Sequence, residues 1–189
     1  MLLKLLHKLG DIFVRLFPLE KQAKLAGVRL GKTSFISSHF WSSEPYLISI
    51  GDNCQITNGV KIYTHGGGHV ARYKYPEFDC FGKVVIGDYV YLGNDCKIMP
   101  GVTIDSHVLV AAGSIVTKSV PSGVVVAGNP ARIICSIDEY IDKNLPYNLS
   151  SKGFSIKKKK RLLLSLPDSK FIKKWKKIMA FIIYMLSRL

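Results

Sequence analysis

Aliphatic residues recur at every sixth position through the middle of the chain. Counting in sixes from position 86 meets only Ile, Leu and Val, and the same count continues upstream beyond a gap of 24 residues. The fourth residue after each of these is small or β-branched, so each hexad offers two side chains to a core. The positions are Ile50, Ile56, Ile62, Ile86, Leu92, Ile98, Ile104, Val110 and Val116, followed by Cys54, Val60, Val90, Cys96, Val102, Val108, Ser114 and Val120.

Turn-forming residues separate the aliphatic positions, as Gly, Asp and Asn do at 51–53, 87–88 and 93–95. The pattern predicts short strands with a corner every six residues. Three such sides close one coil, and coils stack about 4.8 Å apart through strand hydrogen bonds. An all-β core follows, a triangular parallel β-helix. A β-sandwich fits less well, because its strands alternate with period two and turn at irregular intervals.

The two ends of the chain differ from this core. We expect an N-terminal amphipathic helical segment at 1–27, a β-helix domain at 28–135 with a loop insertion at 63–84, and a C-terminal helical basic tail at 136–189. Apolar residues at helical spacing over 2–17 predict a helix that covers the open strand edge or contacts lipid. Ser136-Ile137-Asp138-Glu139 has the form of a capping box and predicts a short helix.

Positive charge is concentrated in the tail. The chain has 27 Lys and Arg against 13 Asp and Glu, and 12 of the basic residues but one acid lie in 151–189. A second helix is predicted from Pro167 onward, with an apolar face between Phe171 and Leu186 and lysines crowding its first half. Such a helix suits an anionic membrane surface. Packing on an oligomer or a solvated tail is the alternative, and nucleic acid is disfavoured because no binding module accompanies the charge.

The compartment predicted is the cytoplasm, with the inner face of the cytoplasmic membrane as the more specific alternative. No apolar run approaches the 18 or so residues of a membrane-spanning helix. Four cysteines show no CxxC pairing, which argues against a zinc knuckle or a disulfide framework. Cys54 and Cys96 fall at inward positions and are expected to be packed thiols.

The hexads, together with GSIVTKSVPSGVVVAGNPARII at 113–134, resemble the hexapeptide-repeat acyltransferases, particularly the galactoside and maltose O-acetyltransferases. The segments SSEPYLISIGDN at 42–53 and SIDEYIDK at 136–143 are similar to acetyltransferases for bacterial surface polysaccharides. The resemblance implies a left-handed parallel β-helix, a homotrimer with each active site between neighbouring subunits, acetyl-CoA as cosubstrate, and no metal.

The loop after Ile62 contains two histidines, three glycines and several aromatic residues, and a loop of this length inside a compact domain is usually functional or disordered. His65 stands where the resembling enzymes carry their catalytic histidine. Histidine has the pKa range that a general base needs to take a proton from an alcohol. His69 is either an acceptor contact or a passive residue of a glycine-rich turn.

The remaining site residues are implied by the same resemblance. Tyr91 and Asn94 would lie beside the thioester, with Asn94 as an oxyanion donor or a simple corner residue. Glu44 and Tyr46 would face the acceptor, and Glu44 either holds sugar hydroxyls, orients His65, or is an ordinary surface carboxylate. Coenzyme A would contact Ala112, Gly113, Ser114, Thr117, Lys118, Asn129 and Arg132, although Gly113 and Ser114 also suit a plain turn and core.

The function expected is O-acetylation of a sugar hydroxyl in capsule, O-antigen or exopolysaccharide synthesis. N-acetylation of a nucleotide-linked amino sugar and O-acetylation of an antibiotic remain open, because the same site would serve a different acceptor. A zinc carbonic anhydrase would need His65, His69 and His107 to converge, and His107 falls at an outward corner. A membrane-docked β-helix scaffold is the alternative outside enzymes.

Overall fold

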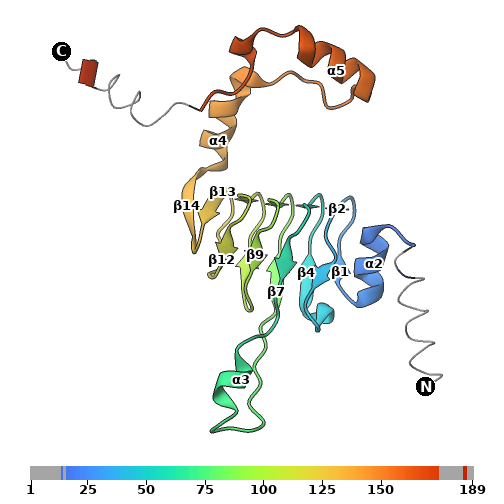
Figure 1. Cartoon of the computed structure of the whole chain (residues 1–189), viewed down its shortest axis with the longest axis vertical. Helices are drawn as coiled ribbons and strands as arrows, with labels where there is room; N and C mark the ends of the chain where they lie inside the picture. Colours follow the sequence, from blue (N-terminus) through green and yellow to red (C-terminus); the bar gives the residue numbers. More distant parts are fainter. Residues whose placement is uncertain (1–13, 15, 175–184, 187–189) are drawn as a thin grey trace. The chain divides into compact units, whose positions relative to one another are not determined.

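The computed structural model describes residues 14, 16–174 and 185–186, and the chain divides into two compact units, Met1–Glu139 and Tyr140–Leu189. The first unit is a stack of coils with three sheets as its sides (Figure 1). Sheet A contains β1 (Arg29–Leu30), β4 (Ile48–Ile50), β7 (Val84–Ile86) and β10 (Thr103–Ile104); sheet B contains β2 (Phe35–Ile36), β5 (Gln55–Ile56), β8 (Tyr91–Leu92), β11 (Leu109–Val110), β13 (Val124–Gly128) and β14 (Ala131–Ser136); sheet C contains β3 (Phe40–Trp41), β6 (Lys61–Ile62), β9 (Lys97–Ile98) and β12 (Ile115–Val116).

The six-residue register predicted from the sequence is confirmed in every coil. Strands of successive coils pair in parallel with aliphatic residues opposite one another, as Ile62 is opposite Ile98 in sheet C. All seventeen inward positions named above are buried, none with more than 6% of its surface exposed. The expected left-handed parallel β-helix is therefore the fold of this unit.

A ladder of polar side chains links the coils at the corner between sheets A and B. The Asp52 carboxylate accepts a hydrogen bond from the Lys32 amide (2.5 Å), and the Asp88 carboxylate accepts one from the Asp52 amide (2.7 Å). Ser106 continues the ladder by accepting from the Asp88 amide at 2.9 Å. The Asp residues that predicted turns, together with Ser106, thus also satisfy backbone donors that a tight corner leaves unpaired.

Both ends of the coil stack are covered. At the first coil lies α2 (Leu19–Ala26), which buries Ala23 completely against the core and whose Glu20 carboxylate accepts a hydrogen bond from the Ile36 amide (3.1 Å). The helix predicted over 2–17 lies largely outside the described residues. At the last coil, β13 adds one more parallel strand to sheet B beside β11, and β14 then folds back antiparallel on β13. The covering helix at one end and the change to an antiparallel strand at the other limit edge-to-edge association.

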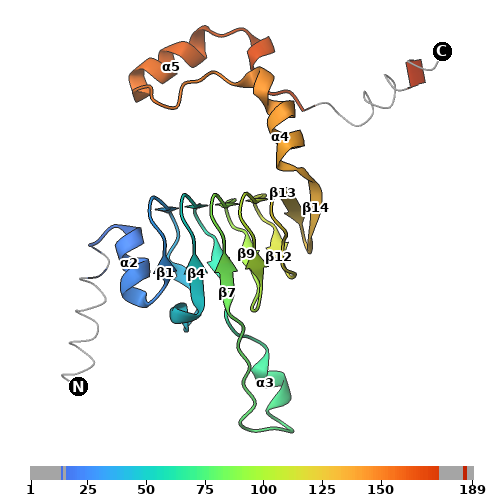
Figure 2. The same cartoon turned by 180° about the vertical axis from the view of Figure 1, so that it is seen from behind.

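The insertion between β6 and β7 leaves the body of the coil stack as an extended arm (Figures 1 and 2). One short helix, α3 (Gly68–Ala71), lies in this arm. A second departure from the coil, the 3-10 turn η1 (Pro45–Leu47), precedes β4 one coil earlier. Strand pairing of β4 with β7 continues across the insertion in unbroken register, so the arm does not disturb the stack.

The C-terminal part of the chain begins with the predicted capping box, which is confirmed. The Ser136 hydroxyl accepts from the Glu139 amide (3.0 Å), and the Glu139 carboxylate accepts from the Ser136 amide (2.7 Å). The helix so started is α4 (Ile137–Asn144), followed by η2 (Leu145–Tyr147), α5 (Ile156–Ser165) and η3 (Asp168–Lys170).

The helix predicted from Pro167 does not begin there. Only the single turn η3 follows the proline, and residues 171–174 are not helical, whereas residues 185–186 are; the rest of that prediction falls on 175–184 and 187–189, outside the described residues. Sequence analysis missed α5, although its cap was visible: Ser155 accepts from the Lys158 amide (3.3 Å). Within the described residues no helix has the length and apolarity to cross a bilayer.

Candidate active site

His65 and Glu44 lie on one edge of the coil stack, where the chain passes from sheet C to sheet A. Glu44 comes shortly after β3 and His65 after β6, and these two strands pair with Trp41 opposite Ile62. Continuing that register by three residues brings Glu44 level with His65 on the neighbouring coil. Two residues 21 positions apart in sequence therefore meet because a coil has closed between them.

The two side chains are in direct contact. His65 Nδ1 lies 2.7 Å from Glu44 Oε2, and the Thr64 hydroxyl donates to the same carboxylate oxygen at 2.7 Å. The Ser42 hydroxyl lies 3.4 Å from His65 Nδ1. The His65 side chain is 37% exposed, the Glu44 side chain 15%, and Thr64 is completely buried. The imidazole is thus held at Nδ1 by the Glu44 carboxylate, and the rest of the ring is partly open to solvent.

The pKa of Glu44 lies below its usual value. The hydrogen bond donated by Thr64 is the main cause; partial burial opposes it, and the neighbouring His65 lowers the pKa further. Glu44 is consequently ionised at neutral pH and can only accept hydrogen bonds. His65 Nδ1 must then carry the hydrogen, which leaves the lone pair on Nε2. This is the tautomer that a general base requires.

The arm fixes His65 from the other side. The Gly82 amide donates to the Thr64 carbonyl (2.7 Å), His65 and Phe81 form an antiparallel bridge, and their rings lie 5.6 Å apart. Gly82 also stacks on the backbone of Gly101 in the next coil, so closely that a Cβ has no room there. Sequence analysis did not identify Thr64, Phe81 or Gly82 as site residues; the glycine at the loop exit was the one available signal.

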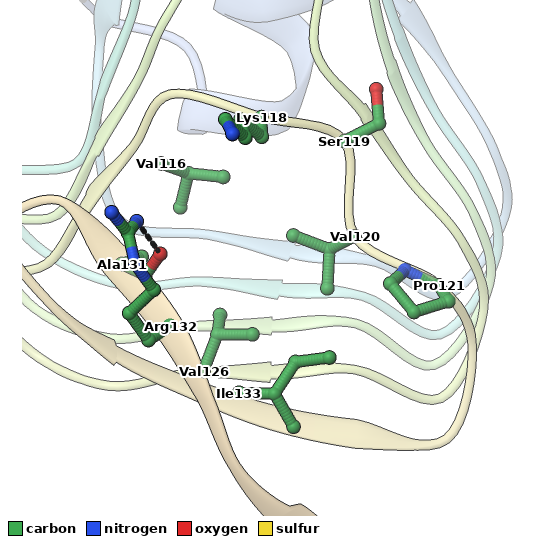
Figure 3. Close-up of a pocket in the computed structure, with 9 residues that line it drawn as sticks. All are labelled: Val116, Lys118, Ser119, Val120, Pro121, Val126, Ala131, Arg132 and Ile133. Carbon is green, nitrogen blue, oxygen red and sulfur yellow. Dashed lines mark hydrogen bonds between the residues drawn. The ribbon is translucent and has the colours of Figure 1, made fainter.

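A basic hollow lies further along the same edge (Figure 3). Lys118 follows β12, two strands beyond β6 in sheet C, which corresponds to about 10 Å along the stack. Arg132 reaches the hollow from the β13–β14 hairpin, with its guanidinium near the Ala131 carbonyl (2.9 Å). The apolar wall is formed by Val116, Val120, Pro121, Val126 and Ile133. Thr117 and Asn129 are exposed beside these two elements.

Another group of predicted residues lies on a different edge, between sheets B and C. Tyr91 is on the outer face of β8, Asn94 is at the corner that follows, and the Asn94 carbonyl accepts from the Gly113 amide (2.8 Å). Ala112 precedes this glycine and is exposed. Within one chain these residues are therefore not brought to His65, which stands between sheets C and A.

Ser114 requires a correction as a coenzyme contact. Only 1% of its surface is exposed, and its hydroxyl accepts from the Gly128 amide at 3.2 Å. It occupies an inward hexad position, where a polar side chain must find a partner inside the fold. Its side chain therefore tethers the hairpin to the last coil and does not face a bound cofactor.

Three further histidine and acceptor predictions have definite places. His69 is exposed in α3, and Tyr46, 62% exposed, lies in η1. Among the described residues, the side chains that hydrogen-bond to the His65 ring are those of Glu44 and Ser42, and not those of His69 or Tyr46. His107 lies at the corner between sheets A and B, where its ring stacks on Tyr89 at 5.1 Å. No cluster of three or more potential metal ligands occurs among residues 14, 16–174 and 185–186.

A parallel β-helix with a carboxylate-supported histidine and a basic hollow on one edge is the arrangement expected of a β-helix acyltransferase. Family models agree: residues 83–118 match the bacterial transferase hexapeptide (six repeats), and residues 48–64 match the hexapeptide repeat of succinyl-transferase. Protein CapG of Staphylococcus aureus is 44% identical over 150 residues, which cover 77% of this chain and 87% of CapG. The chain belongs to the hexapeptide-repeat acetyltransferase family, and the prediction of an enzyme of this class is confirmed.

Two other relatives add detail. A putative colanic acid biosynthesis acetyltransferase, WcaF of Escherichia coli strain K12, is 31% identical over 129 residues, covering 59% of this chain and 70% of WcaF. The solved structure of a galactoside acetyltransferase in complex with coenzyme A superimposes with a TM-score of 0.53 at 27% identity, covering 66% of this chain and 74% of that one. The acetyl donor of this family is acetyl-CoA.

Proposed function

We propose that the protein transfers an acetyl group from acetyl-CoA to a hydroxyl of a sugar or glycan, with His65 as the general base. The observation that carries this proposal is the contact between His65 Nδ1 and Glu44 (2.7 Å), which leaves Nε2 as a free base at an exposed edge. A free base near neutral pH is the one group that O-acetylation cannot do without, since an alcohol is a poor nucleophile until its proton is removed.

The reaction assigns one step to each side chain. His65 Nε2 takes the hydroxyl proton while the acceptor oxygen bonds to the thioester carbonyl carbon. The tetrahedral intermediate then collapses, the carbon–sulfur bond breaks, and Nε2–H returns its proton to the leaving thiolate. Between these two proton transfers His65 is an imidazolium, and the Glu44 carboxylate stabilises that charge through Nδ1–H. Glu44 thus acts as a positioning residue, which replaces the acceptor contact considered for it.

Coenzyme A would lie along the edge that His65 shares with the basic hollow. Lys118 and Arg132 would contact its phosphates, since both are cations at the far end of this edge. Thr117 and Asn129 lie beside them with exposed side chains. A thioester arm running from the hollow toward His65 spans about the 10 Å that separates them.

The residues proposed as oxyanion donors can reach His65 only if two copies of the chain associate. Tyr91 and Asn94, with the Ala112–Gly113 corner beside them, lie on a different edge from His65, so a donor from that edge must come from a neighbouring copy. A homotrimer with each site between two subunits supplies this arrangement, and we propose it as the working form. Asn94 would then hydrogen-bond to the oxyanion from across the interface.

The acceptor is proposed to be a bacterial surface polysaccharide or its precursor. Support comes from the name of WcaF and from the arm, which leaves the stack next to His65 and carries exposed aromatic residues of the kind that stack on sugars. Tyr46 and His69 are the polar contacts proposed for it. The acetylation would take place at the cytoplasmic face of the membrane. A nucleotide-linked amino sugar or an antibiotic as acceptor is the second candidate.

The test measures thiol release from acetyl-CoA across nucleotide sugars, lipid-linked glycans and soluble oligosaccharides. We expect His65→Asn to lower kcat by about 10² to 10⁴-fold, the usual contribution of a general base. His107→Asn is the matched control, because it changes an exposed histidine on another edge to a residue that tolerates its positive φ of 59°. An unchanged rate in His65→Asn refutes the catalytic assignment, and thiol release with none of the acceptors favours a scaffold.

A further inference from the structure

The helix α5 has its positive charges where they oppose helix formation. Five consecutive basic residues, 157–161, fill its first half, and its first turn contains no acidic residue. Cations near a helix N-terminus are unfavourable with the helix dipole, and Lys157 and Arg161 repel each other at a spacing of four. A helix of ten residues is only marginally stable in water even without these penalties. An anionic partner would remove both penalties at once.

The same helix presents an exposed apolar strip between its lysines. Ile156 and Leu163 lie seven residues apart and so share one face, with Leu164 beside them. Ile156 is 90% exposed, Leu164 78% and Leu163 36%. These side chains and Phe154 line a shallow hollow whose rim is formed by Lys159 and Lys160. Apolar and basic side chains therefore occupy the same face of the helix.

We propose that α5 docks the protein on an anionic lipid bilayer. The strip of Ile156, Leu163 and Leu164 enters the boundary between headgroups and acyl chains, and the lysines at its rim contact lipid phosphates. This inference goes beyond acetyl transfer and does not depend on it. It also assigns the membrane contact to a described helix within the basic tail, upstream of the segment in which the sequence had suggested it.

Two local contacts hold α5 in the form that docking needs. Ser155 caps its N-terminus through the Lys158 amide (3.3 Å), and the Lys158 ammonium lies 3.8 Å from the centre of the Phe154 ring. Because of the second contact, the Lys158 ammonium interacts with the Phe154 ring of the same chain. Lys159 and Lys160, which flank the apolar strip, are the cations directed to the same side as Ile156.

Charge and chemistry favour a bilayer over other occupants. A second copy of α5 packed on the strip would bring two sets of five cations together, which is repulsive. Nucleic acid would neutralise the lysines but would press their shared apolar strip against phosphates and sugars, with no gain from burial. A bilayer surface offers anions and hydrocarbon at the same depth, and so satisfies both parts of this face.

The experiment is co-sedimentation of the full chain with vesicles of zwitterionic phospholipid or of a mixture containing about one third anionic phospholipid. We expect binding to the mixed vesicles and its loss at high salt, because exposed charges are screened. Lys159→Gln/Lys160→Gln should weaken partitioning about 25-fold, at about fivefold for each basic residue near an anionic surface. Lys159→Arg/Lys160→Arg should retain binding. Lys24→Gln/Lys32→Gln removes the same charge elsewhere and is the matched control.

The apolar strip is tested separately. Leu163→Gln/Leu164→Gln should weaken vesicle binding by about tenfold or more while leaving the charge unchanged, and Leu25→Gln, at an exposed leucine of α2, should not. Equal vesicle binding by wild type, Lys159→Gln/Lys160→Gln and Leu163→Gln/Leu164→Gln overturns the proposal. So does a smaller oligomer in the leucine variant by light scattering, or tight binding of single-stranded oligonucleotide that the leucine substitutions do not change.

Discussion

The loop exit at Gly82 offers a sharp test of how the coil stack positions His65. Gly82 lies directly on the backbone of the next coil, and a Cβ at this position would be 2.7 Å from the Gly101 Cα and from the Pro100 carbonyl carbon. All the neighbouring atoms are backbone, so no side chain can rotate away. Gly82→Ala must therefore displace either the exit of the arm or the corner at 100–101.

The size of the displacement follows from contact distances. Nonbonded carbon atoms settle at about 3.5 Å, so the Gly82→Ala chain must move by at least about 0.8 Å to clear these two carbons, and further to clear the Gly101 amide nitrogen, which is nearer still. The Gly82 amide is bonded to the Thr64 carbonyl, and Phe81 pairs with His65, so this shift passes directly to the imidazole. A misplacement of about 1 Å in a catalytic group can cost about 100-fold in rate. The local overpacking should also cost about 1–3 kcal/mol of stability.

The assay is thiol release at saturating acceptor, paired with thermal unfolding. We expect Gly82→Ala to lower kcat by about 10 to 100-fold while the protein stays folded at the assay temperature. Gly66→Ala is the matched control in the same arm, since a Cβ at Gly66 meets no atom within 4 Å. Wild-type kcat and an unchanged Tm in Gly82→Ala would refute the reasoning that links this stacking contact to His65.

Two further predictions concern titrating groups. Thr64→Val removes the donor that chiefly lowers the pKa of Glu44, so that pKa should rise. A carboxylate with a lowered pKa stays ionised until the pH falls through that pKa, so Glu44 should become protonated at higher pH in the variant; an NMR titration of the Glu44 carboxyl carbon measures this, and an unmoved titration would contradict it. Burial raises the pKa of Cys96 to about 12 and also raises that of Cys54. A thiol reagent should therefore modify exposed Cys80 in the native protein but reach these two only after unfolding, and a rapid native reaction of all four cysteines would be inconsistent.

The fold could be predicted because a solenoid repeats one local rule. Each hexad places an aliphatic residue and a small residue inward, so the positions from Ile50 to Val120 could be assigned without knowledge of distant contacts. The Ser136–Glu139 cap was predictable for the same reason, since it depends on four consecutive residues. Local signals of this kind survive in the folded chain unless a tertiary contact overrides them.

The site was less predictable because its contacts join different coils. His65 could be singled out, but its bond to Glu44 depends on which coil lies beneath it, and Thr64 is recognisable only once that carboxylate is in place. The assignment of Ser114 as a coenzyme contact failed for a related reason: the partner of its hydroxyl is the Gly128 amide, which belongs to a hairpin that breaks the repeat. In the tail, α5 was missed because its basic and apolar residues stand in two consecutive blocks, which hides the spacing typical of an amphipathic helix.

The insertion between β6 and β7 separates the positioning of the catalytic pair from the contact with the acceptor. The distance from His65 to Glu44 is set by strand pairing between coils, whereas the arm that would contact the acceptor begins and ends at one corner of the stack. The arm can therefore be lengthened, shortened or exchanged while the acid–base pair keeps its spacing, provided that a glycine remains at the exit. New acceptors become accessible to such a chain through replacement of a single segment, a route open both to natural divergence and to loop grafting.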